Sequence, residues 1–207
     1  MGLRIDVTPR SVTALRDQNL VRQVKDYSCG AAALATLLSY GLNDPVTEEQ
    51  ILADLFTQLS STDATVRQKT GFSLLDMQTV AQRRGYKAQA FRLAAQDLVN
   101  LTGPVIVFIE PQGYKHFAVL RGIRGDRVFL ADPSRGNVRM PAYQFMQTWL
   151  GSEGTGIIFV VEPQTAAIGA SNALSVPSGT LSQPELLSAR ELLAVGASSS
   201  RPYESTR

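Results

Sequence analysis

The stretch VRQVKDYSCGAAALATLL, residues 21–38, contains the only cysteine of the chain, Cys29. From this residue onward alanine and leucine dominate and proline is absent, which predicts a helix that begins at the cysteine. At a helix N-terminus the unpaired N–H groups and the helix dipole favour a thiolate, and Gly30 leaves space for a substrate carbonyl. A lone cysteine is more often an inert buried residue, so it is the position at a helix start that makes Cys29 a candidate nucleophile.

A cysteine nucleophile needs a base, and the chain offers a single histidine, His116. This residue opens the strand-like segment HFAVLRGI, and the strand-like segment RVFLADP follows after a turn at residues 124–126. Residues equidistant from a hairpin turn face each other, so position 116 should lie opposite positions 132–134. Asp132 stands there, just before Pro133. A carboxylate beside an imidazole orients the ring and favours its protonated form, so Cys29, His116 and Asp132 are candidates for nucleophile, base and orienting acid.

Gln23 lies upstream of the cysteine in the same stretch. A side-chain amide near a nucleophile can donate a hydrogen bond to the oxyanion of a tetrahedral intermediate, together with the backbone N–H of the nucleophile. An isolated glutamine is more often a polar loop residue, and only its closeness to Cys29 in the sequence makes Gln23 a candidate.

Apolar residues at helical spacing predict further helices in the first half of the chain. One begins at Thr47, with Gln50 in capping-box spacing, and another begins near Ser73. Residues 60–71, SSTDATVRQKTG, join them as a polar linker, and residues 3–20 are an extended lead-in with a short polar helix. In the second half the pattern predicts strands at 86–93, 104–110, 116–123, 127–133 and 156–162, a short helix at 94–101, and a core helix from Pro141 that buries Tyr143, Met146, Trp149 and Leu150.

Helices first and mostly antiparallel strands afterwards describe an α+β domain, with an N-terminal helical half packed on a C-terminal antiparallel sheet. We place this domain at residues 20–162, after a lead-in at 1–19. Residues 163–207 are rich in Ala, Ser, Gly and Pro and predict a flexible tail. Within this tail, residues 184–195, PELLSARELLAV, could form a short amphipathic helix.

The composition excludes several classes of function. With 207 residues and 44% hydrophobic side chains, the chain can form a substantial core. Its net charge of +2 and its scattered Lys and Arg residues argue against nucleic-acid binding, and no apolar run is long enough for a transmembrane segment. One cysteine excludes an internal disulfide, and one cysteine with one histidine does not provide the ligands of a zinc site. We therefore expect no metal and no other cofactor.

Three motifs, QVKDYSCGAAALATLL, HFAVLRGI and VFLADPSRG, resemble the Cys, His and Asp-Pro motifs of the C39 peptidases and occur in the same order. The stretch GFSLLDMQTVAQRRGYKAQAF is similar to the family's middle helix and strand, so the resemblance covers about residues 20–162. It implies a papain-like cysteine peptidase fold. It also implies that Gln23 is the oxyanion glutamine, Cys29 the nucleophile, His116 the base and Asp132 the orienting acid.

The C39 peptidases cut leader peptides after a Gly-Gly pair, so the resemblance implies a peptide or protein substrate with such a site. Members fused to bacteriocin exporters continue into membrane spans and an ATP-binding module, whereas this sequence has no Walker-type glycine loop. The stretch DYSCGAAALATLL is especially similar to the stand-alone peptidases of bacterial functional-amyloid secretion, the Fap type. One departure is Ser28, since many members have Asp directly before the cysteine.

This branch implies a role in the secretion of amyloid subunits or bacteriocin-like peptides, with secretion-system proteins as partners. It also implies a periplasmic location if a signal peptide was removed, and a cytoplasmic one otherwise. Two alternative activities stay open. The same side chains could act as a papain-like amidase or acyltransferase, because the acceptor decides the product. The domain could also be a catalytically silent C39-like module that only binds its substrate.

Overall fold

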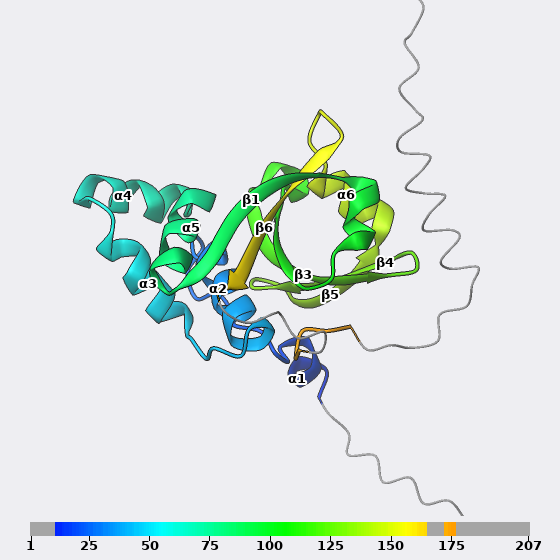
Figure 1. The fold of residues 1–207 in the computed structure, drawn as a ribbon, viewed down its shortest axis with the longest axis horizontal. Coiled ribbons are helices and arrows are strands. Elements are labelled where there is room, and N and C mark those ends of the chain that lie inside the picture. The colour runs from blue at the N-terminus through cyan, green and yellow to red at the C-terminus, as the bar shows by residue number, and fades with distance from the viewer. Residues whose placement is uncertain (1–10, 165–171, 177–207) are drawn as a thin grey trace, which may run out of the picture.

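The computed structural model describes residues 11–164 and 172–176 and divides into a helical half and a sheet half (Figure 1). The expected lead-in is described only from residue 11, and the expected tail helix at 184–195 lies outside the described residues. Within these described residues, five α-helices precede the first strand and one more lies among the strands. The α+β class predicted from the order of the segments is confirmed.

The helical half contains α1 (Val12–Arg16), α2 (Cys29–Thr36), the π-helical turn η1 (Leu37–Gly41), α3 (Glu48–Thr57), α4 (Ser61–Thr70) and α5 (Leu74–Arg83). The sheet half contains β1 (Tyr86–Ala94), β2 (Val105–Ile109), β3 (His116–Arg124), β4 (Arg127–Asp132), β5 (Gly136–Pro141) and β6 (Thr155–Pro163), with α6 (Ala142–Trp149) and the short 3₁₀ turns η2 (Ala95–Asn100) and η3 (Pro111–Gly113).

Helix α2 is the central helix of the molecule, and it begins at Cys29 as predicted. Every one of its residues is buried, which is typical of a helix that is apolar on all sides. It contacts α3 and α5 on one side and β3 and β4 on the other. The first turn of α2 therefore lies where the helical half meets the sheet.

Helices α3 and α5 begin where their capping residues predict. Thr47 accepts a hydrogen bond from the backbone N–H of Gln50, whose side chain accepts one from the N–H of Thr47. Ser73 and Asp76 form the same reciprocal pair at α5. These capping boxes satisfy N–H groups that have no partner within the helix. The residues that then face the core are Ile51 and Leu55 of α3 and Met77, Val80 and Ala81 of α5.

The prediction of a polar linker at residues 60–71 is wrong, because Ser61–Thr70 form helix α4. Ser60 caps this helix by accepting a hydrogen bond from the N–H of Asp63, and the acidic first turn and basic last turn suit the helix dipole. None of its residues is buried. The helix therefore has no apolar stripe for a periodicity argument to detect. Figure 1 shows α4 at the outer edge of the helical half.

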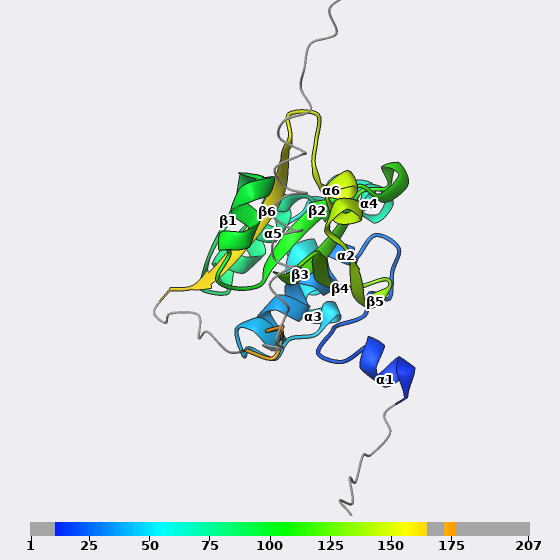
Figure 2. The same ribbon diagram turned by 90° about the vertical axis from the view of Figure 1, so that its right-hand side faces the viewer.

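The sheet half is a six-stranded antiparallel sheet in the order β1-β6-β2-β3-β4-β5. The predicted hairpin is confirmed: Arg124 pairs with Arg127 at the turn, and Val119 pairs with Ala131 beyond a bulge. Figure 1 shows the sheet curled into an open ring, and Figure 2 shows the strands after a quarter turn of the molecule. This hairpin carries both His116 and Asp132.

Two features of the sheet half differ from the prediction. Strand β5, GNVRMP, is not predicted because Val138 and Met140 alone are too short a pattern to indicate a strand, yet it pairs along the whole of β4. Helix α6 starts after Pro141 as expected, but Tyr143 is exposed. Phe145 and Trp149 are its large buried residues, and their spacing of one helical turn directs Tyr143 to solvent.

Two apolar cores lie on the two faces of the sheet. The first lies between the sheet and the helical half and includes Phe117 and Val119 of β3. The second lies between the sheet and α6 and includes Ala118 and Leu120 of the same strand. Successive side chains of a strand point to opposite faces, so β3 is buried on both sides and its position is firmly fixed.

Residues 172–176 pack on the domain, although they belong to the tail predicted from composition. Leu174 is fully buried. The side chains of Asn19, Arg121 and Arg124 donate hydrogen bonds to backbone carbonyl groups of this segment. The domain limits of 20–162 and 163–207 stay a prediction, but these five residues are held against β3 and the end of the lead-in.

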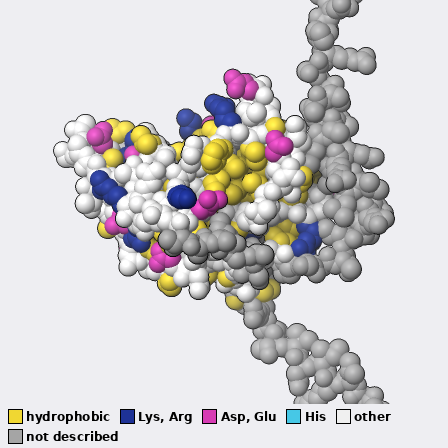
Figure 3. All heavy atoms as spheres, in the orientation of Figure 1, with side chains coloured by type: hydrophobic (Ala, Val, Ile, Leu, Met, Phe, Trp, Pro, Cys, Tyr) yellow, Lys and Arg dark blue, Asp and Glu magenta, His cyan; other side chains and the backbone are white. Residues whose placement is uncertain are grey.

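Charged side chains of both signs are scattered over the face seen in Figure 3, around hydrophobic side chains that gather over the curled sheet. In the described part of the chain, no helix combines the length and the apolar character that crossing a bilayer requires.

Candidate active site

Cys29 is the first residue of α2, and its side chain is free and only 6% exposed. Ser28 occupies the N-cap position without a capping hydrogen bond from its side chain. The space beside Gly30 is not left for a substrate, as the sequence suggested. A Cβ atom there would lie 2.9 Å from the sulfur of Met77 and 3.3 Å from the ring of Phe117. Gly30 instead allows α2 to pack closely on α5 and β3.

The structure brings His116 and Asp132 together as the hairpin argument predicted. His116 is the first residue of β3 and Asp132 the last of β4, and His116 Nε2 lies 2.9 Å from Asp132 Oδ1. Both side chains are buried, at 5% and 2% exposed. A buried carboxylate is costly unless it is paired and hydrogen-bonded, so this contact holds the ring and the carboxylate in place.

Further hydrogen bonds fix the carboxylate of Asp132. The backbone N–H and the hydroxyl of Ser134 and the backbone N–H of Arg135 all donate to Oδ1, at 2.9, 2.9 and 3.0 Å. These donors come from the turn after Pro133, so the end of β4 folds back around its own acid. Such donors favour the ionised carboxylate.

The electrostatics of the pair favour an imidazolium beside a carboxylate. Burial acts to lower the pKa of His116, but hydrogen bonds with Asp132 and Cys29 and the charges of both groups outweigh it and raise this pKa from 6.5 to about 9. Burial likewise acts to raise the pKa of Asp132, and the hydrogen bond and charge of His116, with the donors from Arg135 and Ser134, bring this pKa below its usual value.

Cys29 lies close enough to the imidazole to affect the pKa of His116. The interaction with Cys29 contributes to the raised pKa of His116. Asp132 Oδ1 contacts Nε2 of the ring, which leaves Nδ1 as the ring nitrogen available to the sulfur. The three residues named from sequence thus lie near one another, with His116 in contact with Asp132, and we call Cys29, His116 and Asp132 the contact series.

Gln23 is partly buried beside this series. Its backbone N–H donates to the carbonyl of Pro133 at 3.1 Å, which joins it to the turn after Asp132. Its side-chain Nε2 donates to the carbonyl of Lys25 at 3.1 Å. An amide nitrogen carries two hydrogens, so one remains for another acceptor. The structure thus places Gln23 near the site while its side chain braces the loop that leads to Cys29.

A cavity of about 670 Å³ opens beside Cys29, and we call it the first cavity. It lies between the two halves, and its lining includes Phe72 and Leu74 from the helical half and Phe108 and Phe117 from the sheet. Residues 67–70 of α4 form one side of it. The sequence argument missed this wall, since it did not predict α4.

Tyr114 is a further residue of the site that the sequence pattern did not indicate. It lines the first cavity, and its hydroxyl donates to the backbone carbonyl of Asp26 at 3.1 Å. Its ring centre is 6.2 Å from that of His116. Burial, followed by the charges of Cys29 and Asp26, raises the pKa of Tyr114. The only sequence signal was its position two residues before the histidine.

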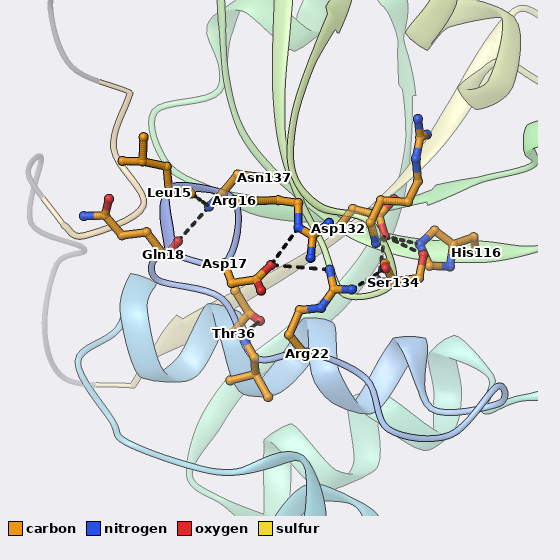
Figure 4. A network of polar contacts seen from close by, with 12 residues as sticks. Leu15, Arg16, Asp17, Gln18, Arg22, Thr36, His116, Asp132, Ser134 and Asn137 are labelled. Atoms are coloured by element: carbon orange, nitrogen blue, oxygen red, sulfur yellow. Dashed lines mark hydrogen bonds and ion pairs between the residues drawn. The ribbon is translucent and has the colours of Figure 1, made fainter. Parts of the chain in front are cut away.

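A second set of contacts links the lead-in to the site (Figure 4). Arg22 lies 3.7 Å from Asp17 and donates a hydrogen bond of 2.6 Å to the backbone carbonyl of Ser134. The Ser134 hydroxyl in turn contacts Asp132. Figure 4 shows these side chains in a row that ends at His116. The segment before α2 therefore supports the turn that holds the acid.

Among the described residues, no group of three or more His, Cys, Asp or Glu side chains is placed to hold a metal ion.

A central helix that starts at a cysteine and packs on an antiparallel sheet carrying a histidine and an acid defines the papain-like peptidase fold. The chain belongs to the peptidase C39 family, whose family model matches residues 17–166. It is 36% identical over 184 residues to a protein of Pseudomonas aeruginosa named "Probable functional amyloid protease FapD". The matched region covers 89% of this chain and 74% of that protein.

Solved structures agree with this membership. A double glycine motif protease from an AMS/PCAT transporter, in complex with the leader peptide, matches with a TM-score of 0.57 and 25% identity, over 72% of this chain and 96% of that one. The peptidase domain of Streptococcus ComA matches with a TM-score of 0.57 and 22% identity, over 70% of this chain and 98% of that one. The second likeness concerns the fold alone.

Proposed function

We propose that this protein is a cysteine endopeptidase that cuts precursor peptides after a Gly-Gly site and so removes their leader. The observation that carries this proposal is the contact series Cys29–His116–Asp132 beside a cavity large enough for a peptide. Because the pKa of His116 is about 9, its ring is protonated near neutral pH and can stabilise a thiolate and later donate a proton.

In the proposed reaction, the Cys29 thiolate attacks the carbonyl carbon of the scissile peptide bond and forms a tetrahedral intermediate. The backbone N–H of Cys29 and the remaining amide hydrogen of Gln23 donate to its oxyanion. His116 then gives its proton to the leaving nitrogen as the C–N bond breaks, which leaves the leader as a thioester. Water, deprotonated by the now neutral His116, attacks the thioester and releases the leader acid and the thiolate. Asp132 orients the ring throughout.

The substrate class is inferred from the relatives. A double glycine motif protease of similar fold was solved with a leader peptide, and a protein with 36% identity is named a functional amyloid protease. We therefore propose that the substrates are leader-bearing amyloid subunits and that the enzyme works with their secretion system. A periplasmic location is part of this proposal.

Incubation of the purified protein with a synthetic leader peptide that contains Gly-Gly, followed by mass analysis, tests the proposal. The wild type should cut after the second glycine, and Cys29→Ala should reduce the rate on the order of a millionfold. Cys29→Ala should stay folded by circular dichroism, because the substitution removes only one atom from the core. A wild type that binds the peptide without cutting it would instead identify a binding module.

The same mass analysis with an added amine separates hydrolysis from acyl transfer, because an amine that captures the thioester leaves a product of different mass. Labelling with iodoacetamide at mildly acidic pH is a second measurement. A thiolate stabilised by His116 reacts there, whereas an ordinary thiol reacts poorly. His116→Ala should abolish the labelling at mildly acidic pH. Equal labelling of the wild type and this variant would contradict the proposed ion pair.

A further inference from the structure

A second cavity, of about 560 Å³, lies beside His116 and Asp132. Its lining includes both of these residues but not the cysteine, whereas the first cavity includes the cysteine but neither of them. Tyr114 lines both cavities and so stands between them. The two cavities therefore adjoin the contact series from its two ends.

Three glutamine side chains dominate the chemistry of the second cavity. Gln144 and Gln147 lie one turn apart on α6 and so share a helix face, and Gln112 reaches it from η3. All three are exposed, and within the described part of the chain none has a side-chain hydrogen bond. Each therefore offers both a donor and an acceptor to a ligand.

The wall of the second cavity is held in place by the backbone and is not merely an open surface. Gln112 has φ of +55°, a left-handed conformation that is unfavourable for residues other than glycine. The loop that carries it is tied to α6 by a hydrogen bond of 2.7 Å from the N–H of Glu110 to the carbonyl of Thr148. This bond holds Gln112 opposite the glutamines of α6, and strained residues of this kind often occur at ligand sites.

The reaction itself assigns different halves of a substrate to the two cavities. After attack, the acyl half of the peptide is bonded to Cys29 and belongs in the cavity that contains the cysteine. The amine half receives its proton from His116 and is therefore released beside the imidazole. The cavity that contains His116 without the cysteine is the place where this half can lie.

We propose that the second cavity is the binding site for the segment that follows the scissile bond, and that it takes an extended peptide with polar side chains. This inference rests on the proposed peptidase function. Amides at three points of the wall can bond the backbone of an extended peptide as well as Gln, Asn or Ser side chains. Asp132 is the only carboxylate in the lining, and the exposed side chain of Arg135 lies at its edge. The site therefore favours acidic residues over Lys or Arg.

Two substrates with the same leader test this site. In the long substrate a segment of Gln, Ser and Glu follows the Gly-Gly pair, and in the short one an aminocoumarin amide follows it directly. The measured quantity is the ratio of kcat/KM for the long substrate to kcat/KM for the short one. The wild type and the variants Gln144→Ala/Gln147→Ala and Gln96→Ala are compared, since Gln96 is an exposed glutamine that lines neither cavity.

We expect the wild type to prefer the long substrate. In the double variant the ratio of the two kcat/KM values should be about tenfold lower than in the wild type, because each lost hydrogen bond weakens binding severalfold. Gln96→Ala should keep the wild-type ratio. Replacing Glu by Lys in the long substrate should lower its kcat/KM, and Arg135→Ala should reduce that difference. If the wild type and the double variant cut both substrates with the same ratio of kcat/KM values, this inference would be overturned and the proposed peptidase function would stand. Failure of the wild type to cut either substrate would overturn the proposed peptidase function and this inference with it.

Discussion

The buried carboxylate of Glu48 accepts a hydrogen bond from the hydroxyl of Ser28, the residue directly before Cys29. It also accepts one from the backbone N–H of Val24 at 3.0 Å. The Ser28 hydroxyl also lies 2.7 Å from the Lys25 carbonyl. That carbonyl already accepts the N–H of Ser28 and the amide of Gln23, so the hydroxyl hydrogen goes to the charged carboxylate of Glu48. Where many family members have Asp before the cysteine, this chain thus has Ser28 and a carboxylate supplied by α3.

We predict that Glu48→Ala weakens both stability and catalysis. It leaves the buried Ser28 hydroxyl and the partly buried Val24 N–H without their acceptor, which costs about 1–3 kcal/mol of the free energy of unfolding. It also releases the loop that positions Gln23 and Cys29, so kcat should fall more than KM rises. Urea unfolding and peptide kinetics measure the two effects.

Glu48→Gln is the matched variant, because the amide keeps one acceptor oxygen. It should recover most of the stability and most of kcat. If Glu48→Ala lost stability but kept the wild-type kcat, Glu48 would be only a structural residue.

We predict that activity falls as the pH rises through about 9, the pKa of His116. Above this pH the ring is neutral and has no proton for the leaving nitrogen. Asp132→Asn removes the charge that favours the imidazolium, so the alkaline fall of kcat/KM should move to lower pH and the maximum should decrease. A profile of kcat/KM from neutral to alkaline pH measures this shift, and an unchanged profile in Asp132→Asn would remove Asp132 from the mechanism.

The same pKa predicts a dependence of stability on pH. The pKa of His116 is raised on folding from 6.5 to about 9, so its contribution to stability is complete below pH 6.5 and is lost as the pH rises through about 9. We expect this loss of stability to be on the order of 1–3 kcal/mol. Urea unfolding of wild type and Asp132→Asn at both ends of this range measures it. The wild type should lose more stability on going to alkaline pH than Asp132→Asn does.

We predict that Asn137→Ala lowers activity from a distance. Asn137 Nδ2 donates to the carbonyl groups of Leu15 and Gln18 at 3.3 and 2.8 Å, and so fastens the lead-in to β5. Without it, Arg22 is held less firmly against Ser134, and the turn that orients Asp132 loosens. We expect a severalfold lower kcat with a smaller change in KM. Asn100→Ala, at an exposed end of η2, is the control and should match the wild type.

We predict that residues 172–176 stabilise the domain. Leu174 is fully buried in the core between the sheet and the helices, and replacing such a leucine by alanine costs about 2–5 kcal/mol. Leu75→Ala is the control, since Leu75 is 68% exposed. Urea unfolding measures both variants. If Leu174→Ala unfolded like Leu75→Ala, the segment would contribute little to the fold.

The sequence by itself determined the parts that depend on local pattern. Alanine and leucine after Cys29 set the start of α2, capping residues set the starts of α3 and α5, and the turn at 124–126 set the hairpin. Because a hairpin relates residues that are close in sequence, it was enough to place His116 beside Asp132. Helix α4 was missed because none of its residues is buried, and burial is what creates a periodic pattern.

Only the tertiary structure decided what meets across the halves of the molecule. The hydrogen bond from Tyr114 to Asp26, the support of Ser28 by Glu48 and the packing of Leu174 join residues that are far apart in sequence. No local pattern records such contacts, because they depend on how separate elements pack. The same holds for the two cavities near the imidazole, because the wall of each comes from several separate elements.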